Sequence, residues 1–217
     1  MDLFEYYNIN YAHNLPSNKE AKILDFGCGS GITLRYLQNR GYNNLNGVDI
    51  KSYETWGEMS DKGINLTMFG DITTYLETIK SCYDFIILKD VLYYFTEDTV
   101  VQNTTLLKEA LNVGGKMLFD IINGSVITGS FTMNKDLDIR MVLTEHSLVT
   151  IIERSGLRVD SLYEDRIVIS GLRSGLYFWA NLLHKLNLKV IYFSERGVDS
   201  QNPKILSKKI IAIASVI

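Results

Sequence analysis

Five residues in the first quarter of the chain have the types and the spacing of a nucleotide-binding site. Gly27, Gly29 and Gly31 alternate with other residues, and glycines at this spacing let the backbone turn sharply and let a ligand approach the main chain. Asp49 follows Gly29 by twenty residues, a distance at which a carboxylate can accept hydrogen bonds from both hydroxyls of a ribose. Asp25 precedes the first glycine. A carboxylate there would repel a pyrophosphate and would attract a ligand with a cationic end.

A strand–turn–helix–strand unit would bring these residues together. The apolar run Ile23–Phe26 predicts a buried parallel strand before the glycines. Apolar residues at helical spacing predict a helix over residues 32–40, which Gly41 ends. A second short strand, Leu45–Val48, places the second acid at its tip. The dinucleotide fingerprint needs another glycine where this chain has Ile32, so that pattern fails.

The series Asp-x-Gly-x-Gly-x-Gly, followed by the second acid, resembles motif I of the class I S-adenosylmethionine-dependent methyltransferases. The resemblance implies an α/β, Rossmann-like fold: a seven-stranded, mostly parallel sheet with an antiparallel last strand and helices on both faces. It implies S-adenosyl-L-methionine as the cofactor and S-adenosyl-L-homocysteine as the product. The resemblance also implies which residues bind each part of the cofactor. Asp49 and Ile50 would bind the ribose, Asp25 the amino-acid end, and the loop of Gly27, Cys28, Gly29 and Gly31 the methionine part. The alternative is an unrelated α/β protein with a glycine-rich turn.

Two later strand ends extend the expected cofactor site. The predicted strand Leu66–Phe69 leads to Asp71 and Ile72, which match the family's adenine-binding position. There the carboxylate would accept from the exocyclic amine and the apolar side chain would cover the ring. Asp71 could instead cap the helix that follows it, and both roles are compatible because a carboxylate has two oxygens. Lys89 follows the predicted strand Tyr83–Leu88 and is the cofactor-binding residue expected there.

The catalytic residues are less clearly indicated. Many small-molecule members of the family that this chain resembles carry a histidine after the fourth strand, where this chain has Tyr93 and Tyr94. We expect His146 to be the general base, because it follows a predicted lid at the mouth of the site and a neutral imidazole suits a hydroxyl acceptor. Glu145 and the two tyrosines are rivals. A solvent-facing histidine at a helix start is the alternative interpretation of His146.

Apolar periodicity predicts the remaining elements. Helices are expected at 53–62, 97–112 and 145–155, and strands at 117–122, 157–163 and 204–217. Residues 1–20 should form a short helix and a loop, which in the resembling family fold over the cofactor or the substrate. Residues 123–143 lack a steady period and are expected to be a lid loop. Residues 164–203, with a helix at 176–186, are too long for a simple turn and should be a cap over the site or an association surface, such as a homodimer contact.

Composition excludes several classes of protein. The 217 residues, 46% of them hydrophobic and 22% charged, are expected to form one soluble methyltransferase domain. The net charge of −3 and the absence of a basic run argue against a nucleic-acid partner. No apolar stretch reaches transmembrane length. Cys28 and Cys82 are expected to be reduced thiols in a cytoplasmic protein. No cluster has the spacing of metal ligands, so no metal is expected.

The sequence therefore predicts an S-adenosylmethionine-dependent methyltransferase that acts on a small polar metabolite. The segments around the expected acceptor side are rich in tyrosines, which favours O-methylation of a sugar or a sugar nucleotide. The chain end also resembles methyltransferases associated with bacterial surface-polysaccharide assembly. Two alternatives stay open: N-methylation of a small amine, and a cofactor-binding protein without catalysis. An NAD(P)-dependent oxidoreductase is disfavoured by the missing glycine and by the absence of a Tyr-x-x-x-Lys pair.

Overall fold

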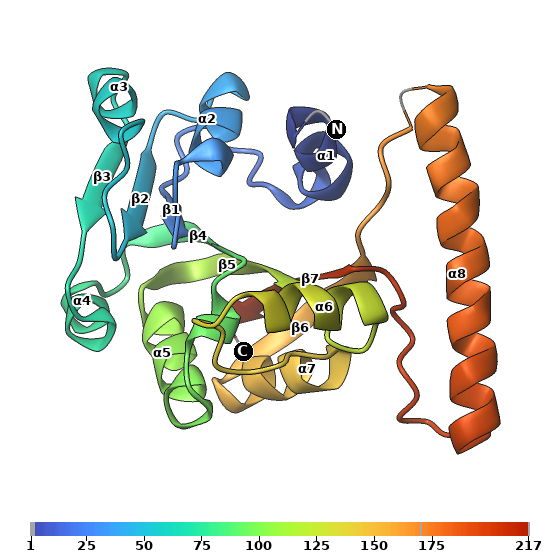
Figure 1. The fold of residues 1–217 in the computed structure, drawn as a ribbon. Coiled ribbons are helices and arrows are strands. Elements are labelled where there is room, and N and C mark those ends of the chain that lie inside the picture. The colour runs from blue at the N-terminus through green and yellow to red at the C-terminus, as the bar shows by residue number, and fades with distance from the viewer. Residues whose placement is uncertain (1–2, 170, 217) are drawn as a thin grey trace.

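The centre of the computed structural model is a seven-stranded sheet in the order β3-β2-β1-β4-β5-β7-β6 (Figure 1). The structure describes residues 3–169 and 171–216. The strands are β1 Ile23–Phe26, β2 Leu45–Asp49, β3 Asn65–Met68, β4 Tyr83–Lys89, β5 Leu111–Ile122, β6 Leu157–Glu164 and β7 Lys209–Val216. Strands β1 to β5 pair in parallel, and β7 runs antiparallel to both β5 and β6. The predicted fold class is confirmed.

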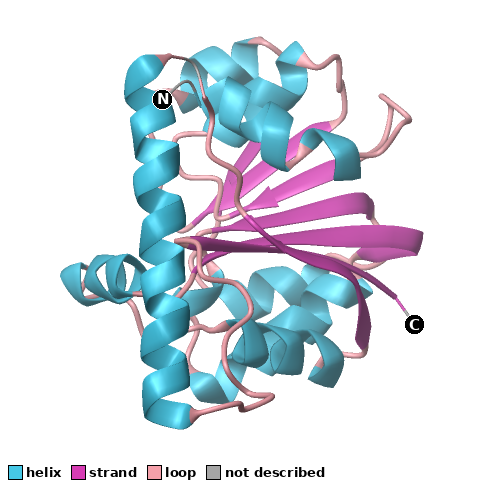
Figure 2. Ribbon diagram, turned by 90° about the vertical axis from the view of Figure 1, so that its right-hand side faces the viewer, coloured by secondary structure: helices cyan, strands magenta, loops and turns pink. Residues whose placement is uncertain are grey.

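Helices cover both faces of this sheet (Figure 2). They are α1 Leu3–Asn10, α2 Ile32–Asn39, α3 Trp56–Asp61, α4 Ile72–Thr78, α5 Glu97–Glu109, α6 Ile127–Lys135, α7 Glu145–Arg154 and α8 Leu172–Arg196, with 3-10 turns η1 Ala12–Asn14 and η2 Leu92–Tyr94. Thr96 and Thr144 begin α5 and α7 with capping boxes, which satisfy free backbone N–H groups of the first turn. Gly41 and Gly156 follow α2 and α7 in the left-handed conformation that ends many helices.

Strand alternation divides the apolar side chains between two cores. On β4, Ile86 and Leu88 pack on the face covered by α4, α5 and α7, whereas Phe85 and Ile87 pack on the face covered by α1, α2 and α3. Because successive side chains of a strand point to opposite faces, a strand covered on both sides is apolar throughout. This explains the continuous apolar run Phe85–Leu88 within β4.

Four segments differ from the sequence-based expectation. The strand expected at 117–122 is β5, which begins inside the helix expected at 97–112, because Leu111 pairs with Tyr83 of β4. Residues 123–143 are not all loop, since they contain the nine-residue helix α6. The helix expected at 176–186 is the 25-residue α8. The last strand begins at Lys209 and not at 204, because the backbone N–H groups of Lys204 and Ile205 donate to Glu145 Oε2 instead of to the sheet. Residues 1, 2, 170 and 217, which fall in predicted segments, lie outside the described residues.

The long helix α8 runs alongside the helix layers of the domain (Figure 2). It follows β6 and returns to β7 through residues 197–208. Among the helices that the structure describes, none is long and apolar enough to cross a membrane.

Candidate active site

The glycine loop is held open by its three left-handed glycines and by the acid at the tip of β2. Gly27, Gly29 and Gly31 have φ values of +74°, +54° and +78°, a region that favours glycine. A Cβ on Gly27 or Gly31 would also collide with a neighbouring side chain at 2.2 Å. Asp49 Oδ2 accepts from the Gly29 N–H at 2.8 Å, and Trp56 Nε1 donates to the Gly29 carbonyl at 2.8 Å. The loop and the carboxylate are therefore a preformed unit.

Asp25 is a buried carboxylate that lacks a full set of partners. Its side chain is 2% exposed, and among residues 3–169 and 171–216 nothing bonds its Oδ2. Burial raises the pKa of Asp25 to about 7, and the nearby Lys89 only partly opposes this rise. A buried acceptor without a partner is costly, and a ligand ammonium placed beside it would remove that cost. The residues therefore fit the amino-acid end of S-adenosylmethionine.

The expected adenine contacts stand at the edge of the site. Asp71 Oδ1 accepts from the Thr74 N–H at 2.8 Å, so Asp71 is the N-cap of α4. This helix-capping role, one of the two weighed from the sequence, is present, and the adenine role stays a prediction for the other oxygen. Ile72 is half-buried, and Ile50 is exposed beside Asp49.

Three ion pairs join the ends of β4 and β5 to the start of β7. They form what we call the strand-end charge cluster: Lys89, Asp90, Asp120 and Lys209. Lys89 Nζ lies 2.7 Å from Asp90 Oδ2. Lys209 Nζ lies 2.9 Å from Asp120 Oδ1 and is also paired with Asp90. Asp120 is fully buried. Burial raises the pKa of Asp90, but Lys209 and Lys89 outweigh it and hold the pKa at about 2.

Three tyrosines surround this cluster. Tyr93 donates to Asp90 Oδ1 at 3.1 Å, and Tyr11 donates to Asp120. The Tyr6 hydroxyl is buried and has no partner within the part of the chain that the structure describes. Burial raises the Tyr6 pKa far above its ordinary value, and the charge of Asp120 adds to the rise. The hydroxyl therefore stays protonated and can serve a ligand as a donor or an acceptor.

The backbone at Asp90 adds to the evidence for a functional position. Asp90 has φ +58° although it is not a glycine, and such conformations persist only where the surroundings enforce them. Its N–H donates to the Asp120 carbonyl at 2.9 Å. This geometry holds the carboxylate at the end of β4, between the two lysines.

The three predicted catalytic candidates fall in different places. Tyr93 belongs to the cluster, whereas the Tyr94 hydroxyl donates to Asp136 Oδ2 at 2.8 Å and is half-exposed. His146 lines a cavity of about 340 Å³ with residues of α7, α8 and 200–204. Glu145, the rival carboxylate, binds two backbone N–H groups of the chain before β7. The structure thus joins only Tyr93 to the charged residues beside Asp25.

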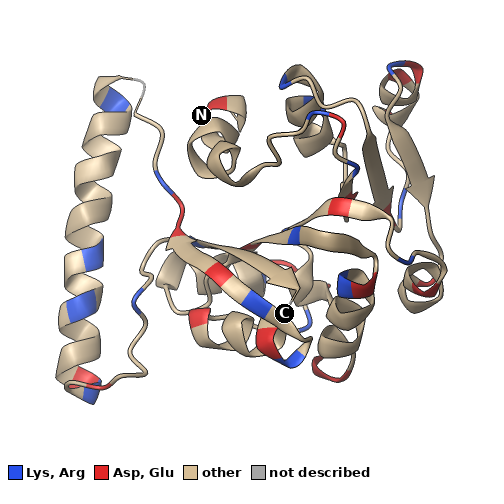
Figure 3. Ribbon diagram, turned by 180° about the vertical axis from the view of Figure 1, so that it is seen from behind, with Lys and Arg blue, Asp and Glu red and all other residues tan. Residues whose placement is uncertain are grey.

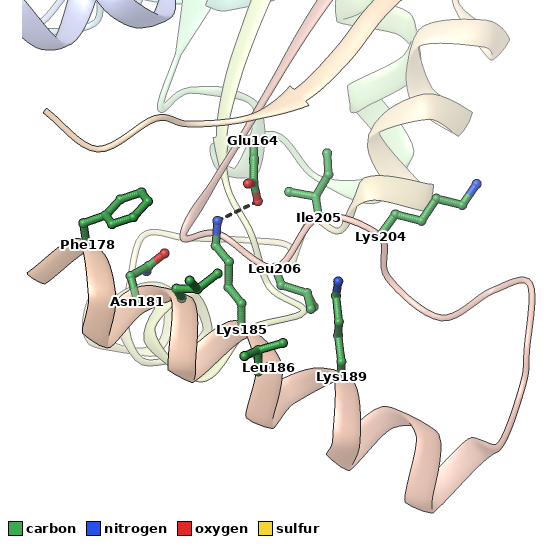
Figure 4. A pocket seen from close by; sticks show the side chains of 10 residues that line it. Glu164, Phe178, Asn181, Lys185, Leu186, Lys189, Lys204, Ile205 and Leu206 are labelled. Atoms are coloured by element: carbon green, nitrogen blue, oxygen red, sulfur yellow. Dashed lines mark ion pairs between the residues drawn. The ribbon is translucent and has the colours of Figure 1, made fainter.

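All three predicted lid segments reach this region. In the N-terminal segment, Tyr7 and Tyr11 are buried and stack at a centroid distance of 5.0 Å. In the 123–143 segment, the Arg140 N–H donates to the Tyr93 carbonyl at 2.8 Å. The 164–203 segment reaches it through its first residues, since the Arg166 N–H donates to Asn10 Oδ1 at 2.7 Å and Val168 is buried in one cluster with Tyr7 and Tyr11. Its later residues line a cavity of about 400 Å³ between α8 and the chain before β7, with Lys185 paired to Glu164 at 2.8 Å (Figure 4).

Comparisons with known proteins identify the relatives of this arrangement. A family model described as "Methyltransferase domain" matches residues 3–162, most of the chain. No curated protein sequence matches the chain significantly.

Solved structures share the fold at low sequence identity. A putative methyltransferase of Haloferax volcanii, in complex with the Trm112 methyltransferase activator, aligns with a TM-score of 0.67 and 13% identity over 100% of this chain and 98% of its own. A SAM-dependent methyltransferase of Archaeoglobus fulgidus gives 0.63 and 16% over 89% and 85%. A Burkholderia thailandensis 1,6-didemethyltoxoflavin-N1-methyltransferase with bound S-adenosylhomocysteine gives 0.62 and 11% over 98% and 77%.

Proposed function

The chain belongs to the methyltransferase domain family and uses S-adenosylmethionine, and from this premise we propose that it methylates a hydroxyl group of a small, sugar-like metabolite. The cofactor supplies a methyl group on a sulfonium, already activated for displacement. The protein must hold this cofactor, align the acceptor and exclude water. Each of these tasks has candidate residues at the ends of β1, β2, β4 and β5.

The proposed cofactor contacts follow from the donors and acceptors that the loop presents. Asp49 would accept hydrogen bonds from the ribose hydroxyls while it holds the Gly29 N–H. Asp25 would pair with the ammonium group through its unpartnered oxygen. Gly27, Gly29 and Gly31 would let the methionine part approach the backbone.

The strand-end charge cluster is the observation that carries the acceptor proposal. Its two lysines and two aspartates balance in charge, which favours a neutral polar ligand over a polyanion such as nucleic acid. The unpartnered Tyr6 hydroxyl, which the charges of Asp120 and Asp90 both influence, offers a further hydrogen bond. Lys89 links the cofactor residue Asp25 to the strand-end charge cluster. Its charge partly opposes the rise in the pKa of Asp25, and its Nζ pairs with Asp90.

We assign the alignment of the acceptor hydroxyl to Asp90. A carboxylate with a pKa of about 2 is a weak base, so it would not remove the proton before the reaction begins. It would accept the hydrogen bond of the hydroxyl, orient an oxygen lone pair toward the methyl carbon, and receive the proton as the new C–O bond forms and the C–S bond breaks. His146 is the rival base, and it lies in a cavity lined by other residues.

The test begins with a screen of acceptors by mass spectrometry for the gain of one methylene unit. Sugars and sugar nucleotides come first, because the chain end resembles methyltransferases of surface-polysaccharide assembly; small amines form the second set. With the acceptor in hand, we expect Asp90→Asn to lower kcat by at least about 100-fold and His146→Ala to leave it within about threefold. Binding of S-adenosylhomocysteine, measured by calorimetry, should be retained in both variants. The reverse ranking of the two variants would return the base to His146, and methylation of amines alone would overturn the hydroxyl proposal.

A further inference from the structure

One side of α8 carries an exposed apolar stripe. It consists of Leu172, Leu176, Trp179, Leu183, Val190 and Phe193. These residues follow one another at steps of three, four or seven, which return to the same side of a helix. Each is exposed, and Trp179 and Leu183 are both 62% exposed. A soluble helix normally turns such a stripe toward the core.

The opposite side of α8 is the one that faces the domain. Leu188 is buried against Val126 and Leu206. The Tyr192 hydroxyl donates to the Ser125 carbonyl at 2.7 Å, and Lys185 pairs with Glu164 (Figure 4). At about 100° per residue, these contacts lie across the helix from Leu183 and Val190. The apolar stripe therefore points away from the rest of the protein.

The charges on α8 differ in sign from those of the whole chain. The helix carries four basic residues and a single acid, Glu195, near its C-terminal end, whereas the chain has a net charge of −3. Lys185 and Arg196 are paired with Glu164 and Asp199 outside the helix, which leaves Arg173 and Lys189 as its cations without an ion pair among the described residues. Figure 3 shows positive bands along the helix and acidic colour only near its end. At about 100° per residue, Arg173 falls beside the apolar stripe, whereas Lys189 lines the cavity on the domain side of α8 (Figure 4). A long cationic side chain beside such a stripe can extend toward a charged surface while its stem covers apolar groups.

We propose that α8 binds the surface of an anionic phospholipid bilayer, with its axis parallel to the membrane plane and its apolar stripe among the headgroups and upper acyl chains. Leucines and aromatic residues on one face, with cations beside them, are what an interfacial helix requires. The charge favours lipid over a second copy: another α8 would bring the same cations without an ion pair, Arg173 and Lys189, and only Glu195 as an acid of the helix, whereas anionic lipid complements these cations. The inference does not depend on the identity of the methyl acceptor.

Sedimentation with vesicles of two compositions tests the proposal. One set contains phosphatidylglycerol and phosphatidylcholine in equal parts, and the other contains phosphatidylcholine alone. We expect the full chain to sediment with the anionic vesicles and to be released by high salt. Trp179 provides a second signal. The other tryptophan, Trp56, is buried and bonded to Gly29, so a blue shift upon vesicle addition, absent in Trp179→Phe, reports the helix.

Matched variants separate the stripe from the rest of the surface. Leu183→Glu should lower the partition coefficient by about tenfold or more. Val113→Glu, which introduces the same acid at a fully exposed apolar residue of β5, should leave the partition coefficient unaltered. Arg173→Gln, beside the stripe, should cost about fivefold on anionic vesicles, and Lys189→Gln, in the domain-side cavity, should cost less. Retained binding of S-adenosylhomocysteine would show that each variant is folded.

Three results would overturn the proposal. The first is no association with anionic vesicles, and the second is association that Leu183→Glu leaves unchanged. The third is a dimer in analytical ultracentrifugation that Leu183→Glu dissociates and that does not bind vesicles, which would assign the stripe to a second copy of the chain. None of these results bears on acceptor turnover, so failure here is distinguishable from failure of the proposed activity.

Discussion

The strand ends and the helix α8 depart from the usual distribution of side chains in opposite directions. At the ends of β1, β4 and β5, ionisable groups that normally face water are buried, among them Asp25 and Asp120. On α8, large apolar side chains such as Trp179 and Leu183 face outward. Each departure is expensive for an isolated chain, so each marks a place where something else contributes to the energetics.

The two regions differ in how far the folded chain itself offsets that cost. In the strand-end charge cluster, ion pairs and hydroxyl donors satisfy most of the polar groups. Beside it, among residues 3–169 and 171–216, Asp25 Oδ2 and the Tyr6 hydroxyl are buried without a partner and are left for a ligand. On α8, no described residue covers the stripe centred on Leu183. Substitutions at the strand ends should therefore destabilise the fold or weaken ligand binding, whereas substitutions on the stripe should do neither.

Removal of a cluster cation should have the largest effect. Lys209→Met leaves Asp120 buried without its cation, and loss of one member of a buried pair costs about 3–5 kcal/mol of unfolding free energy. Urea denaturation measures this loss of unfolding free energy. Lys185→Met is the matched control, because its partner Glu164 is half-exposed, and such a pair is worth less than about 1 kcal/mol. Equal losses in the two variants would show that the cluster is not buried as described.

Loss of the ribose carboxylate should come next. Asp49→Ala leaves two ligand hydroxyls without an acceptor, at a cost of roughly 2–4 kcal/mol, so S-adenosylhomocysteine should bind one to three decades more weakly, at about 1.4 kcal/mol per decade. Calorimetry measures the change. Glu58→Ala, which removes an exposed carboxylate paired with Lys62 on α3, is the control. An Asp49→Ala variant with unaltered affinity would contradict the cofactor assignment.

The same contrast explains what the sequence could predict. The unit from Ile23 to Asp49 is local: its strands, glycine turn and helix lie within one short stretch, so residue spacing alone positions the loop beside the acid. Helix starts at Thr96 and Thr144 and helix ends at Gly41 are also local signals, and the structure contains them.

The strand-end charge cluster depends on long-range register and was missed. Asp90, Asp120 and Lys209 meet only because β7 inserts antiparallel beside β5, with Ile122 opposite Lys209. The available signal was a charged residue inside an apolar strand, Asp120 in the run Met117–Ile122. The apolar period of α8 was recognised, but a period does not reveal which side of a helix faces the domain, and here the apolar side faces outward.

The titration of Asp25 should give a moderate effect. Its pKa is raised from 3.8 to about 7 by burial, so the folded chain holds a proton that the unfolded chain has lost. Between these values the stability of the ligand-free protein should therefore fall as pH rises.

A ligand ammonium favours the carboxylate, so S-adenosylhomocysteine should bind more tightly as pH rises to about 7, by up to about tenfold per pH unit. Calorimetry across this range measures the trend, and Asp25→Asn should flatten it. A flat profile in the unmodified protein would place the ammonium elsewhere.

The smallest effect is expected on the stripe of α8. Leu183 is 62% exposed, so Leu183→Ala removes side-chain atoms that already contact water, and the unfolding free energy should change by no more than about 0.5 kcal/mol. Leu188→Ala, the same substitution on the buried side of the helix, removes packing against Val126 and Leu206 and should cost about 2 kcal/mol or more. Urea denaturation of both variants at low protein concentration, without lipid, measures the difference. A large loss for Leu183→Ala would mean that the stripe packs on protein in solution, and the contrast between the two regions would then be wrong.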